Sequence, residues 1–502
     1  MESGRNGEPF MYNILFINPV YNKNEVLGPF AKYITSQIPL TIGFLAGYLE
    51  TKFKNINIKI IDEQFKQLTE VDLENFINEY TPSVIGFTVY TLTAYRAYFL
   101  GTLIKNKWPH IKVVMGGVHA TLLPDEPLEK GAADFVVRNE GEITLTELLD
   151  TIWNKKAAFN NIAGLSYILD GSICHNKARK LIENLDDLPN FPYHYFEDNI
   201  SRYQFGNMLT TRGCPYECTF CSQRSIAGRT YRARSPEKVV EEMEILVNKY
   251  NQRWITFNND NFIVNKKQVH RICDLIIQNK FPKDLKLGVN ARGDAVTEDV
   301  LLHMRQAHFT TISFGLETGS ERIMKLIKKS ETVEDIENGV RIAKKCGFIT
   351  TGSFIIGLPT ETRKETIQTI KHAFKIPLDF ARFNILVPYP GSEIYEIIQK
   401  DEIHKVKDWS NYATHSGISG NTIPYVPAGR TAKELLKLQW YGNLLFYLRP
   451  KQIFNISKLK YATFGQVLLP EPNSFKGIFE LTVFAFRLIG HWLMSNIRKS
   501  PM

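Results

Sequence analysis

The stretch TTRGCPYECTFC, from Thr210 to Cys221, holds half of the cysteines of this 502-residue chain. Cys214, Cys218 and Cys221 follow the spacing C-x3-C-x2-C, so three thiolates can converge on one metal centre from a short loop. The other cysteines lie far from this motif, and we interpret them as core thiols: Cys174, Cys273 and Cys346. The nature of the metal centre therefore depends on the fourth ligand.

A structural zinc site is closed and four-coordinate, so it would need a further cysteine or histidine nearby. The nearest histidines, His194 and His270, do not have the spacing of a zinc finger. A [4Fe–4S] cluster can leave one iron without a protein ligand, open to a substrate. Gly213 and Pro215 favour a loop over a packed strand, which argues against coincidental core cysteines. We interpret the motif as an iron–sulfur site, with zinc as the alternative.

An aromatic residue, Phe220, directly precedes the third cysteine. With it, the motif resembles that of the radical S-adenosylmethionine (SAM) superfamily. The resemblance implies that Cys214, Cys218 and Cys221 hold three irons of a [4Fe–4S] cluster, that SAM chelates the fourth, and that Phe220 lies beside SAM. One electron then cleaves SAM, and a 5′-deoxyadenosyl radical takes hydrogen from an unactivated carbon. The family also uses an electron donor such as flavodoxin or ferredoxin.

The composition is that of an ordinary globular protein, with 44% hydrophobic and 23% charged residues. The net charge of +9 is scattered without a dense basic tract, which disfavours a nucleic-acid partner. The N-terminus lacks the pattern of a signal peptide, and no apolar run is long enough to span a bilayer. Few, clustered cysteines fit a reducing compartment. We expect a cytoplasmic protein.

From Tyr12 to about Trp153, short apolar runs alternate with amphipathic stretches. The expected strands are Asn13–Ile17, Ile58–Ile61, Val84–Val89, Val113–Met115 and Phe135–Val137. The expected helices include Leu40–Tyr48, Val71–Tyr80 and Tyr95–Lys107. Near-continuous apolar strands between such helices predict an α/β fold with a doubly wound parallel sheet. Such sheets bind ligands beyond the carboxyl ends of their strands.

Three segments at those strand ends carry polar or glycine residues, including Thr88, Gly116, Gly117 and Gly141. Glycine lets a bulky ligand approach the backbone closely. Gly116 and Gly117 could also do no more than make a turn, and this alternative stays open. The order and setting of the segments resemble the cobalamin-binding domain that often precedes a radical SAM domain. The resemblance implies that these four residues contact cobalamin.

One departure from that pattern concerns the loop after the first strand. Many cobalamin domains carry Asp-x-His-x-x-Gly there, whose histidine replaces the cofactor's own base beneath cobalt. Here the loop reads NPVYNKN, Asn18 to Asn24, and the first histidine of the chain is His110. We expect either cobalamin without a histidine beneath cobalt or a domain that has lost the cofactor. For His119 we prefer a turn residue that bonds its own backbone over a ligand.

The sequence divides into four parts. Residues 11–155 form the expected cobalamin-binding domain, and residues 156–203 a connector with a hairpin across Asp170-Gly171 and a proline-rich linker. Residues 204–408 form the catalytic domain, and residues 409–502 a helical C-terminal region.

The third part repeats a strand-then-helix unit. The expected strands are Met208–Thr211, Trp254–Asn258, Leu287–Asn290, Thr311–Gly315, Gly352–Ile356 and Phe383–Leu386, with helices such as Pro236–Tyr250 and Lys266–Gln278. These units suggest an open (β/α)6 barrel, the partial barrel of the radical SAM family. In barrels of this kind the chemistry lies at the carboxyl ends of the strands.

Polar residues follow several of these strands, as the resemblance requires. Asn259 and Asp260 match the segment that binds the SAM amino group, and Glu317 matches the acidic residue that reaches SAM, although it could instead cap the next helix. Gly357 begins Gly-Leu-Pro-Thr-Glu, similar to the family's Gly-Leu-Pro-Gly-Glu, with Thr360 in place of the second glycine. Arg292 could meet the SAM carboxylate or form a surface salt bridge.

Beyond about Asp408 the repeats stop. Thr431–Leu448 reads as a helix, and Lys458–Leu469 and Phe475–Ile497 continue a basic, aromatic helical tail. We expect the tail to cover the barrel mouth as a lid, with contact to a membrane surface as the alternative. Either role would suit a small-molecule substrate that is large and hydrophobic.

These observations predict a radical SAM enzyme that uses cobalamin to methylate an unactivated carbon. One alternative is a radical SAM enzyme that does not methylate, such as an oxidative cyclase, a ring-rearranging enzyme or a carbon–carbon coupling enzyme. The alternative of another class is a zinc- or nucleic-acid-binding protein.

Overall fold

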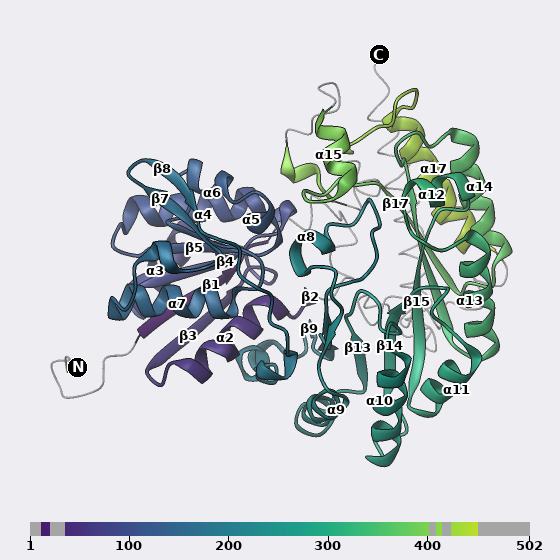
Figure 1. The fold of residues 1–502 in the computed structure, drawn as a ribbon, viewed down its shortest axis with the longest axis horizontal. Coiled ribbons are helices and arrows are strands. Elements are labelled where there is room, and N and C mark those ends of the chain that lie inside the picture. Colours follow the sequence, from purple (N-terminus) through teal and green to yellow (C-terminus); the bar gives the residue numbers. More distant parts are fainter. Residues whose placement is uncertain (1–11, 21–35, 401–407, 414–422, 450–502) are drawn as a thin grey trace.

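The computed structural model describes residues 12–20, 36–400, 408–413 and 423–449. Two sheets, each covered by helices, lie side by side with their strands' carboxyl ends turned toward a shared central region (Figure 1). The α/β fold class and the two kinds of sheet expected from the sequence are confirmed.

The first sheet has the strand order β3-β1-β4-β5-β6-β7-β8. Its parallel part comprises β1 (Tyr12–Asn18), β3 (Ile56–Asp62), β4 (Val84–Thr88), β5 (Lys112–Gly116) and β6 (Phe135–Val137). The hairpin of β7 (Leu165–Leu169) and β8 (Ser172–His175) extends it in antiparallel fashion. The order reverses between β1 and β4, which is where doubly wound sheets bind ligands.

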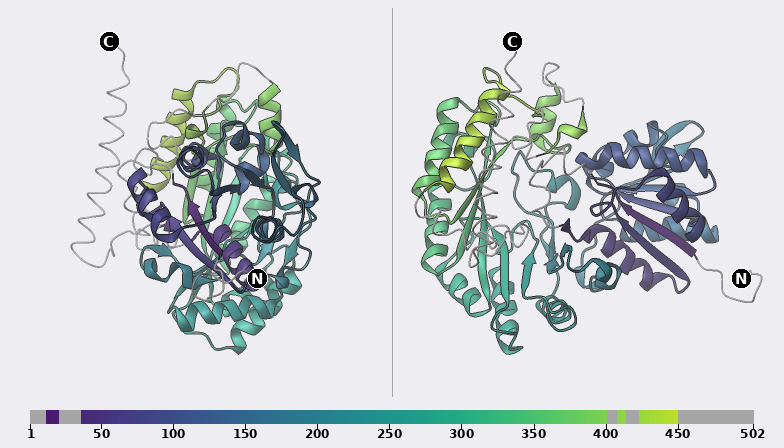
Figure 2. Two further views of the ribbon diagram at one scale, coloured as in Figure 1. Left: turned by 90° about the vertical axis from the view of Figure 1, so that its left-hand side faces the viewer. Right: turned by 180° about the vertical axis from the view of Figure 1, so that it is seen from behind.

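Helices cover both faces of this sheet (Figures 1 and 2). Those on one face are α2 (Leu40–Lys52) and α7 (Gly141–Asn154), and those on the other are α3 (Glu70–Tyr80) and α4 (Ala94–Lys107). The buried residues of β1 alternate accordingly: Ile14 and Phe16 pack toward α2 and α7, whereas Leu15 and Ile17 pack toward α3 and α4. Two short helices, α5 (Val118–Leu122) and α6 (Asp125–Glu129), follow β5.

The second sheet has the order β10-β13-β14-β15-β16-β17, with every neighbouring pair parallel. Its strands are β10 (Asn207–Met208), β13 (Trp254–Phe257), β14 (Lys286–Ala291), β15 (Phe309–Glu317), β16 (Ile349–Ile356) and β17 (Phe380–Ile385). Its longer helices are α9 (Pro236–Glu244), α10 (Lys266–Gln278), α11 (Glu298–Gln306), α13 (Val333–Lys345) and α14 (Arg363–Lys375). This is the predicted six-stranded partial barrel.

Smaller elements complete the described chain. Two short ladders pair β2 (Ser36–Gln37) with β9 (Tyr203–Gln204) and β11 (Thr211–Arg212) with β12 (Arg232–Ala233). The remaining helices are α8 (Gln223–Ala227), α12 (Glu321–Leu326), α15 (Glu393–Lys400) and α17 (Ala432–Tyr447). The short 3-10 and π turns are Thr91–Thr93, Phe159–Asn161, Leu185–Asp187, Tyr193–Asn199, Ile245–Lys249 and Trp409–Asn411.

The first helix of the C-terminal region, α17, packs along a sheet edge, and the tail expected to form a lid follows it. The helix begins after the cap residue Thr431 and runs along β17, the last strand of the barrel sheet. The expected tail segments Lys458–Leu469 and Phe475–Ile497 lie outside the described residues. Within residues 12–20, 36–400, 408–413 and 423–449, no helix has the length and apolar character of a membrane span.

Side chains of α17 hydrogen-bond the backbone edge of β17. Gln439 Nε2 donates to the carbonyl of Phe383 at 2.9 Å, and Asn443 Oδ1 accepts from the N–H of Phe383 at 3.3 Å. Tyr447 donates its hydroxyl to the carbonyl of Ala381 at 2.8 Å. These three side chains recur every four residues, on one helix face. The helix therefore covers an edge that would otherwise leave backbone groups unpaired.

The interpretation of the isolated cysteines holds for two of the three. Cys273 and Cys346 are buried in the barrel core. Cys174 lies on β8 and is half-buried, because the hairpin forms the outer edge of the first sheet.

We predict that Gln439→Leu lowers the free energy of unfolding by about 1–3 kcal/mol, because the Phe383 carbonyl would lose its shorter hydrogen bond in a buried setting. Urea unfolding measures the change. Lys433→Ala, at an exposed position of the same helix, serves as the control and should change stability little. Equal stability of both variants would contradict the role given to this edge contact.

Candidate functional site

A cavity of about 420 Å³ lies between the carboxyl ends of the two sheets. The first domain contributes glycine and polar residues at its strand ends, including Thr88, Gly116, Gly117, Glu140, Gly141 and Glu142. The barrel domain contributes residues around the cysteine loop, including Thr211, Arg212, Gln223, Ile226, Asn258 and Asp260. The four residues predicted to contact cobalamin therefore share one space with Asp260, predicted to contact SAM.

The first-domain wall has a backbone that leaves no room for side chains. Gly117 has φ of +90°, and a Cβ there would lie 2.9 Å from Thr88 Oγ1 and 2.9 Å from the Val89 nitrogen. A Cβ on Gly116 would lie 3.3 Å from the Val137 carbonyl oxygen. Thr88 Oγ1 is buried and has no hydrogen-bond partner among the described residues. A glycine cradle beside an orphaned hydroxyl fits a bulky ligand that carries hydrogen-bonding groups.

His119 is neither a ligand facing the cavity nor a turn residue bonded to its own backbone. It is fully buried on α5, and its Nε2 lies 3.0 Å from Glu126 Oε2 while its Nδ1 lies 3.3 Å from Thr91 Oγ1. Trp409 also donates its indole N–H to Glu126, at 2.9 Å. The histidine therefore anchors a buried contact between the first domain and the C-terminal region.

The cysteine loop is pinned by backbone contacts on both sides. Gly213 has φ of +85°, and a Cβ there would lie 2.2 Å from the Thr230 carbonyl oxygen. The Thr219 N–H donates to the carbonyl of Ile327 at 2.9 Å, and its carbonyl accepts from the N–H of Ile394 at 2.9 Å. Phe220 packs against the barrel core while staying partly exposed. The protein's own backbone contacts thus fix the path of the loop.

Cys214, Cys218 and Cys221 are free thiols close enough to influence one another's ionisation. Burial raises the pKa of all three thiols, that of Cys221 to about 12. Soft thiolate ligands suit an iron–sulfur cluster, and binding one would displace protons from these thiols. Among the described residues, no three His, Cys, Asp or Glu side chains are arranged to hold a single metal ion.

Asp260 faces the cavity beside the cysteine loop. Gln223, two residues after Cys221, hydrogen-bonds its side chain, and burial raises the pKa of its carboxyl. Asn259 points away: its amide accepts from the Thr210 N–H at 3.0 Å and donates to Thr210 Oγ1 at 2.7 Å. Of this predicted pair, Asp260 is therefore placed to meet a ligand, whereas the Asn259 side chain braces the strand end.

Buried charges lie behind the cysteine loop. Arg292 stacks on the Tyr216 ring, with its guanidinium carbon 3.6 Å from the ring centroid, and pairs with Glu331 at 3.0 Å. Lys329 Nζ lies 3.0 Å from Glu317 Oε1. Burial raises the pKa of Glu331 to about 7. Burial opposes the charged form of Lys329, but Glu317 and Glu331 raise its pKa above the ordinary value.

This network answers two questions left open by the sequence. Arg292 is buried, so its ion pairs are not a surface salt bridge, and its guanidinium is already bonded to Asp294 at 2.8 Å. Glu317 does not cap the next helix, because Ser320 does so through its hydroxyl. Lys329 and Glu331 were missed in the sequence, where a charged run after a short helix indicates only a solvated loop.

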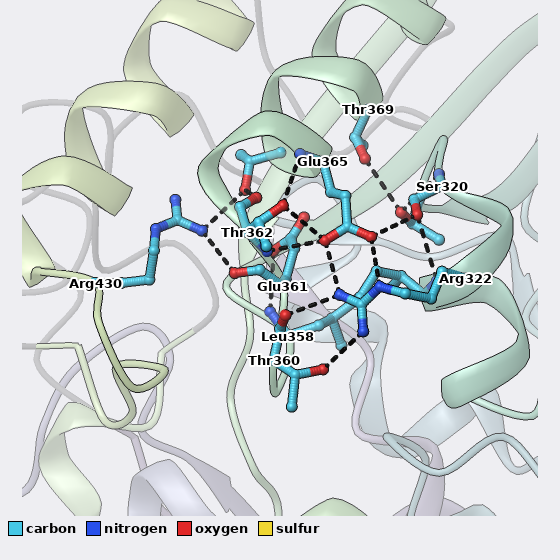
Figure 3. Close-up of polar contacts among 12 residues, drawn as sticks. Ser320, Arg322, Leu358, Thr360, Glu361, Thr362, Glu365, Thr369 and Arg430 are labelled. Atoms are coloured by element: carbon cyan, nitrogen blue, oxygen red, sulfur yellow. Dashed lines mark hydrogen bonds and ion pairs between the residues drawn. The ribbon is translucent and has the colours of Figure 1, made fainter.

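The loop after β16 folds around a buried carboxylate (Figure 3). Glu361 Oε2 accepts from the N–H groups of Gly357 at 2.5 Å and Leu358 at 3.1 Å. Burial raises the pKa of Glu361 to about 7. Arg430 closes the loop by donating to the Glu361 carbonyl at 3.0 Å. Gly357 has φ of +80°, so this position favours glycine.

Thr360 does adopt the left-handed conformation that a second glycine would favour, with φ of +59°. Such a conformation costs a non-glycine residue roughly 1–2 kcal/mol. Arg322 offsets the cost by donating to the Thr360 carbonyl at 2.8 Å and to its hydroxyl at 3.1 Å (Figure 3).

Comparisons with known proteins agree with both halves of this site. Residues 208–373 match the family model described as the radical SAM superfamily. Residues 31–149 match the B12 binding domain. An uncharacterised methyltransferase of Pyrococcus horikoshii is 34% identical, over 83% of this chain and 89% of that protein.

Two further matches are more distant. An anaerobic magnesium-protoporphyrin IX monomethyl ester cyclase of Cereibacter sphaeroides is 27% identical, over 80% of this chain and 65% of that protein. The solved structure of TsrM, a radical SAM methyltransferase of Kitasatospora setae, has cobalamin and a [4Fe–4S] cluster bound. It is similar with a TM-score of 0.65 at 19% identity, covering 86% of this chain and 85% of that one, which shows a shared fold.

We predict that Glu361→Gln removes a pH-dependent loss of stability. The pKa of Glu361 is raised from 4.5 to about 7, so folding favours the protonated carboxyl, and stability is lost as the pH rises through that window. Glutamine cannot ionise, yet it still accepts both N–H groups. At about 1.4 kcal/mol per pKa unit, the variant should gain up to about 3 kcal/mol over the wild type above pH 7 and nothing below pH 4.5.

Urea unfolding at pH 4.5 and pH 8 tests this prediction. Glu365→Gln, in the first turn of α14, is the matched control, because Arg322 holds the pKa of Glu365 below its ordinary value. That variant should lose stability at pH 8, the opposite sign. A Glu361→Gln variant that loses stability at pH 8 would show that the buried carboxylate is favourable as the anion.

Proposed function

The chain belongs to the radical SAM enzymes that carry a B12-binding domain, and from that premise we propose that it transfers a methyl group to an unactivated carbon of a small molecule. Membership brings a [4Fe–4S] cluster, SAM and cobalamin as cofactors. When bound, the cluster supplies the electron that cleaves SAM, and cobalamin carries the methyl group. The relative from Pyrococcus horikoshii is also described as a methyltransferase, which supports this choice.

The observation that carries the proposal is the shared cavity. Thr88 and Gly117 on one wall and Asp260 on the other line the same space of about 420 Å³. A substrate carbon held there would be within reach of groups bound on both walls, as methylation by two cofactors requires. Cofactors held in separate pockets would not support this reaction.

On the barrel wall, we assign Cys214, Cys218 and Cys221 to the cluster. Asp260 carries a carboxylate that suits the SAM ammonium group. Lys329 and Glu317 form an ion pair near Cys218, and the pair offers one group of each sign for the charged end of SAM. Arg292 does not contact SAM itself in this assignment; it holds Glu331 and Tyr216 in place. Gly357 and Asn259 fix the backbone at the strand ends. Phe220, within the cysteine loop, packs against the barrel core.

Three further assignments concern the surroundings. The substrate is a small molecule, and a cavity lined largely by apolar residues supports a large hydrophobic one. An electron donor such as flavodoxin or ferredoxin would reduce the cluster. The six cysteines are all free thiols, which supports a reducing compartment and hence a cytoplasmic location.

We predict that the holoenzyme, given SAM with an isotopically labelled methyl group, a reductant and a small-molecule cell extract, forms S-adenosylhomocysteine and 5′-deoxyadenosine together. The label should appear in a small-molecule product, because one SAM donates the methyl group and another generates the radical. Mass spectrometry of the mixture measures all three species. Cys218→Ala is the control and should form no 5′-deoxyadenosine. Formation of 5′-deoxyadenosine without S-adenosylhomocysteine or a labelled product would favour a cyclase or another non-methylating enzyme.

A second prediction concerns the cobalamin wall. Thr88→Val should raise the Kd for cobalamin by about 3- to 10-fold, the value of one hydrogen bond, because Thr88 Oγ1 has no partner among the described residues. The same lack of an internal bond should leave folding unchanged. Equilibrium dialysis of apoprotein with hydroxocobalamin measures the affinity, and Thr88→Ser, which keeps the hydroxyl, should bind like the wild type. Unchanged affinity in Thr88→Val would remove Thr88 from the site.

A further inference from the structure

Two arginines beside the cysteine loop face two glutamates of the first domain. Arg212 on β11 and Arg232 on β12 are directly opposed partners of one antiparallel ladder. Arg212 Nη2 donates to Glu142 Oε1 at 2.6 Å, and Arg232 Nη1 donates to Glu140 Oε1 at 2.8 Å. Arg212 also lies 3.4 Å from Glu140. We call these four side chains the interdomain clamp.

The clamp can exist only when the two domains are together. Opposed like charges on a two-stranded ladder repel, and Arg212 and Arg232 are both largely buried, with side chains 13% and 5% exposed. Glu142 and Glu140 place carboxylates against these two guanidinium groups. Both compensating carboxylates come from the first domain. The ladder next to the cysteine loop is therefore stabilised from across the domain boundary.

The clamp also joins the two cofactor walls directly. Glu140 and Glu142 flank Gly141, which lines the cobalamin side of the cavity. Arg212 lines the same cavity and is separated from Cys214 by Gly213 alone. Next to this glycine, the Cys214 N–H donates to the carbonyl of Gly228 at 3.3 Å. Because one residue separates them, a displacement of the Arg212 backbone is transmitted directly to Cys214.

We propose that the interdomain clamp sets the separation between the cluster and cobalamin, with Arg212 and Glu142 as positioning residues. The proposal deepens the proposed function and rests on it, since it needs both cofactors in one protein. Contacts such as Asn139 Nδ2 to the Ile226 carbonyl, at 2.9 Å, also cross the boundary but carry no full charge. Among the ion pairs of the described residues, those of the clamp connect the segment around the cavity-lining Gly141 to the segment around Cys214.

The test measures the distance between the two metal centres. The protein is reconstituted with iron, sulfide and hydroxocobalamin and reduced until both centres are paramagnetic, and pulsed electron paramagnetic resonance gives their dipolar frequency. Glu142→Gln and Arg212→Gln should each shift that frequency while retaining cobalamin and about four irons per chain. The double variant should show no more than the shift of one single variant, because the two residues act as a pair.

Glu147→Gln is the matched control, because Glu147 lies on α7, the helix that also carries Glu142. Its partner Arg179 lies in the connector and bonds Glu147, Thr144 and Ala163, none of which belongs to the cysteine loop. The Glu147→Gln variant should keep the wild-type frequency. Arg212→Lys, which keeps the charge, provides a milder variant should Arg212→Gln not fold, and it should shift the frequency less. If Glu142→Gln and both Arg212 variants kept the wild-type dipolar frequency, the proposal that the clamp sets the separation would be wrong.

The proposed function also fails if the wild-type protein retains the cluster but binds no cobalamin, and this result is distinct from failure of the clamp. In that case the clamp is tested in the protein that carries the cluster alone. The measurement is the hydrogen-exchange rate of the backbone amides of residues 211–221. Faster exchange in Glu142→Gln than in Glu147→Gln would support the clamp. Equal exchange would overturn it.

Discussion

Parallel strands send all their carboxyl ends to one edge of a sheet, and this constraint organises the whole protein. Two such edges face one another here, that of the β3-β1-β4-β5-β6 sheet and that of the barrel sheet. Loops at those edges do not have to fill the core between sheet and helices as the strands do, so they can carry glycines, cysteines and charged residues. The cavity forms where the two sets of loops meet. Its position follows from topology, whereas its chemistry follows from the loop residues.

Burying charges at this junction has a cost that only paired groups can offset. Lys329 with Glu317, and Arg292 with Glu331, do so behind the cysteine loop. An ionised side chain in such a setting contributes little net stability even when paired, but an unpaired one is strongly destabilising. The pairs therefore constrain where each loop can lie. The same electrostatics leave Glu331 with a pKa of about 7, a sign that its two cationic neighbours compensate burial only in part.

The sequence predicted the elements with strong periodicity and missed those that depend on distant partners. The expected barrel strands and the helix at Thr431–Leu448 match β13 to β17 and α17 closely, because their patterns are local. The two-residue ladders, such as β11 with β12, carry no pattern long enough to detect. Gly117 was found because glycine at a strand end lets a ligand approach the backbone, and its φ of +90° shows that the position also favours glycine conformationally. Lys329 was missed because its burial depends on Glu317, which reaches it only in the folded barrel.

His119 shows how far residue type alone can mislead. A histidine after Gly116-Gly117 suggests a ligand or a turn, yet Glu126 and Trp409 engage it on the side away from the cavity. Among the described residues that line the cavity there is no histidine, and Asn18 to Asn24 contain none. An imidazole beneath cobalt would thus have to come from outside these positions. The first-domain wall instead offers glycine backbone and the Thr88 hydroxyl, groups that suit a large ligand by shape and hydrogen bonding.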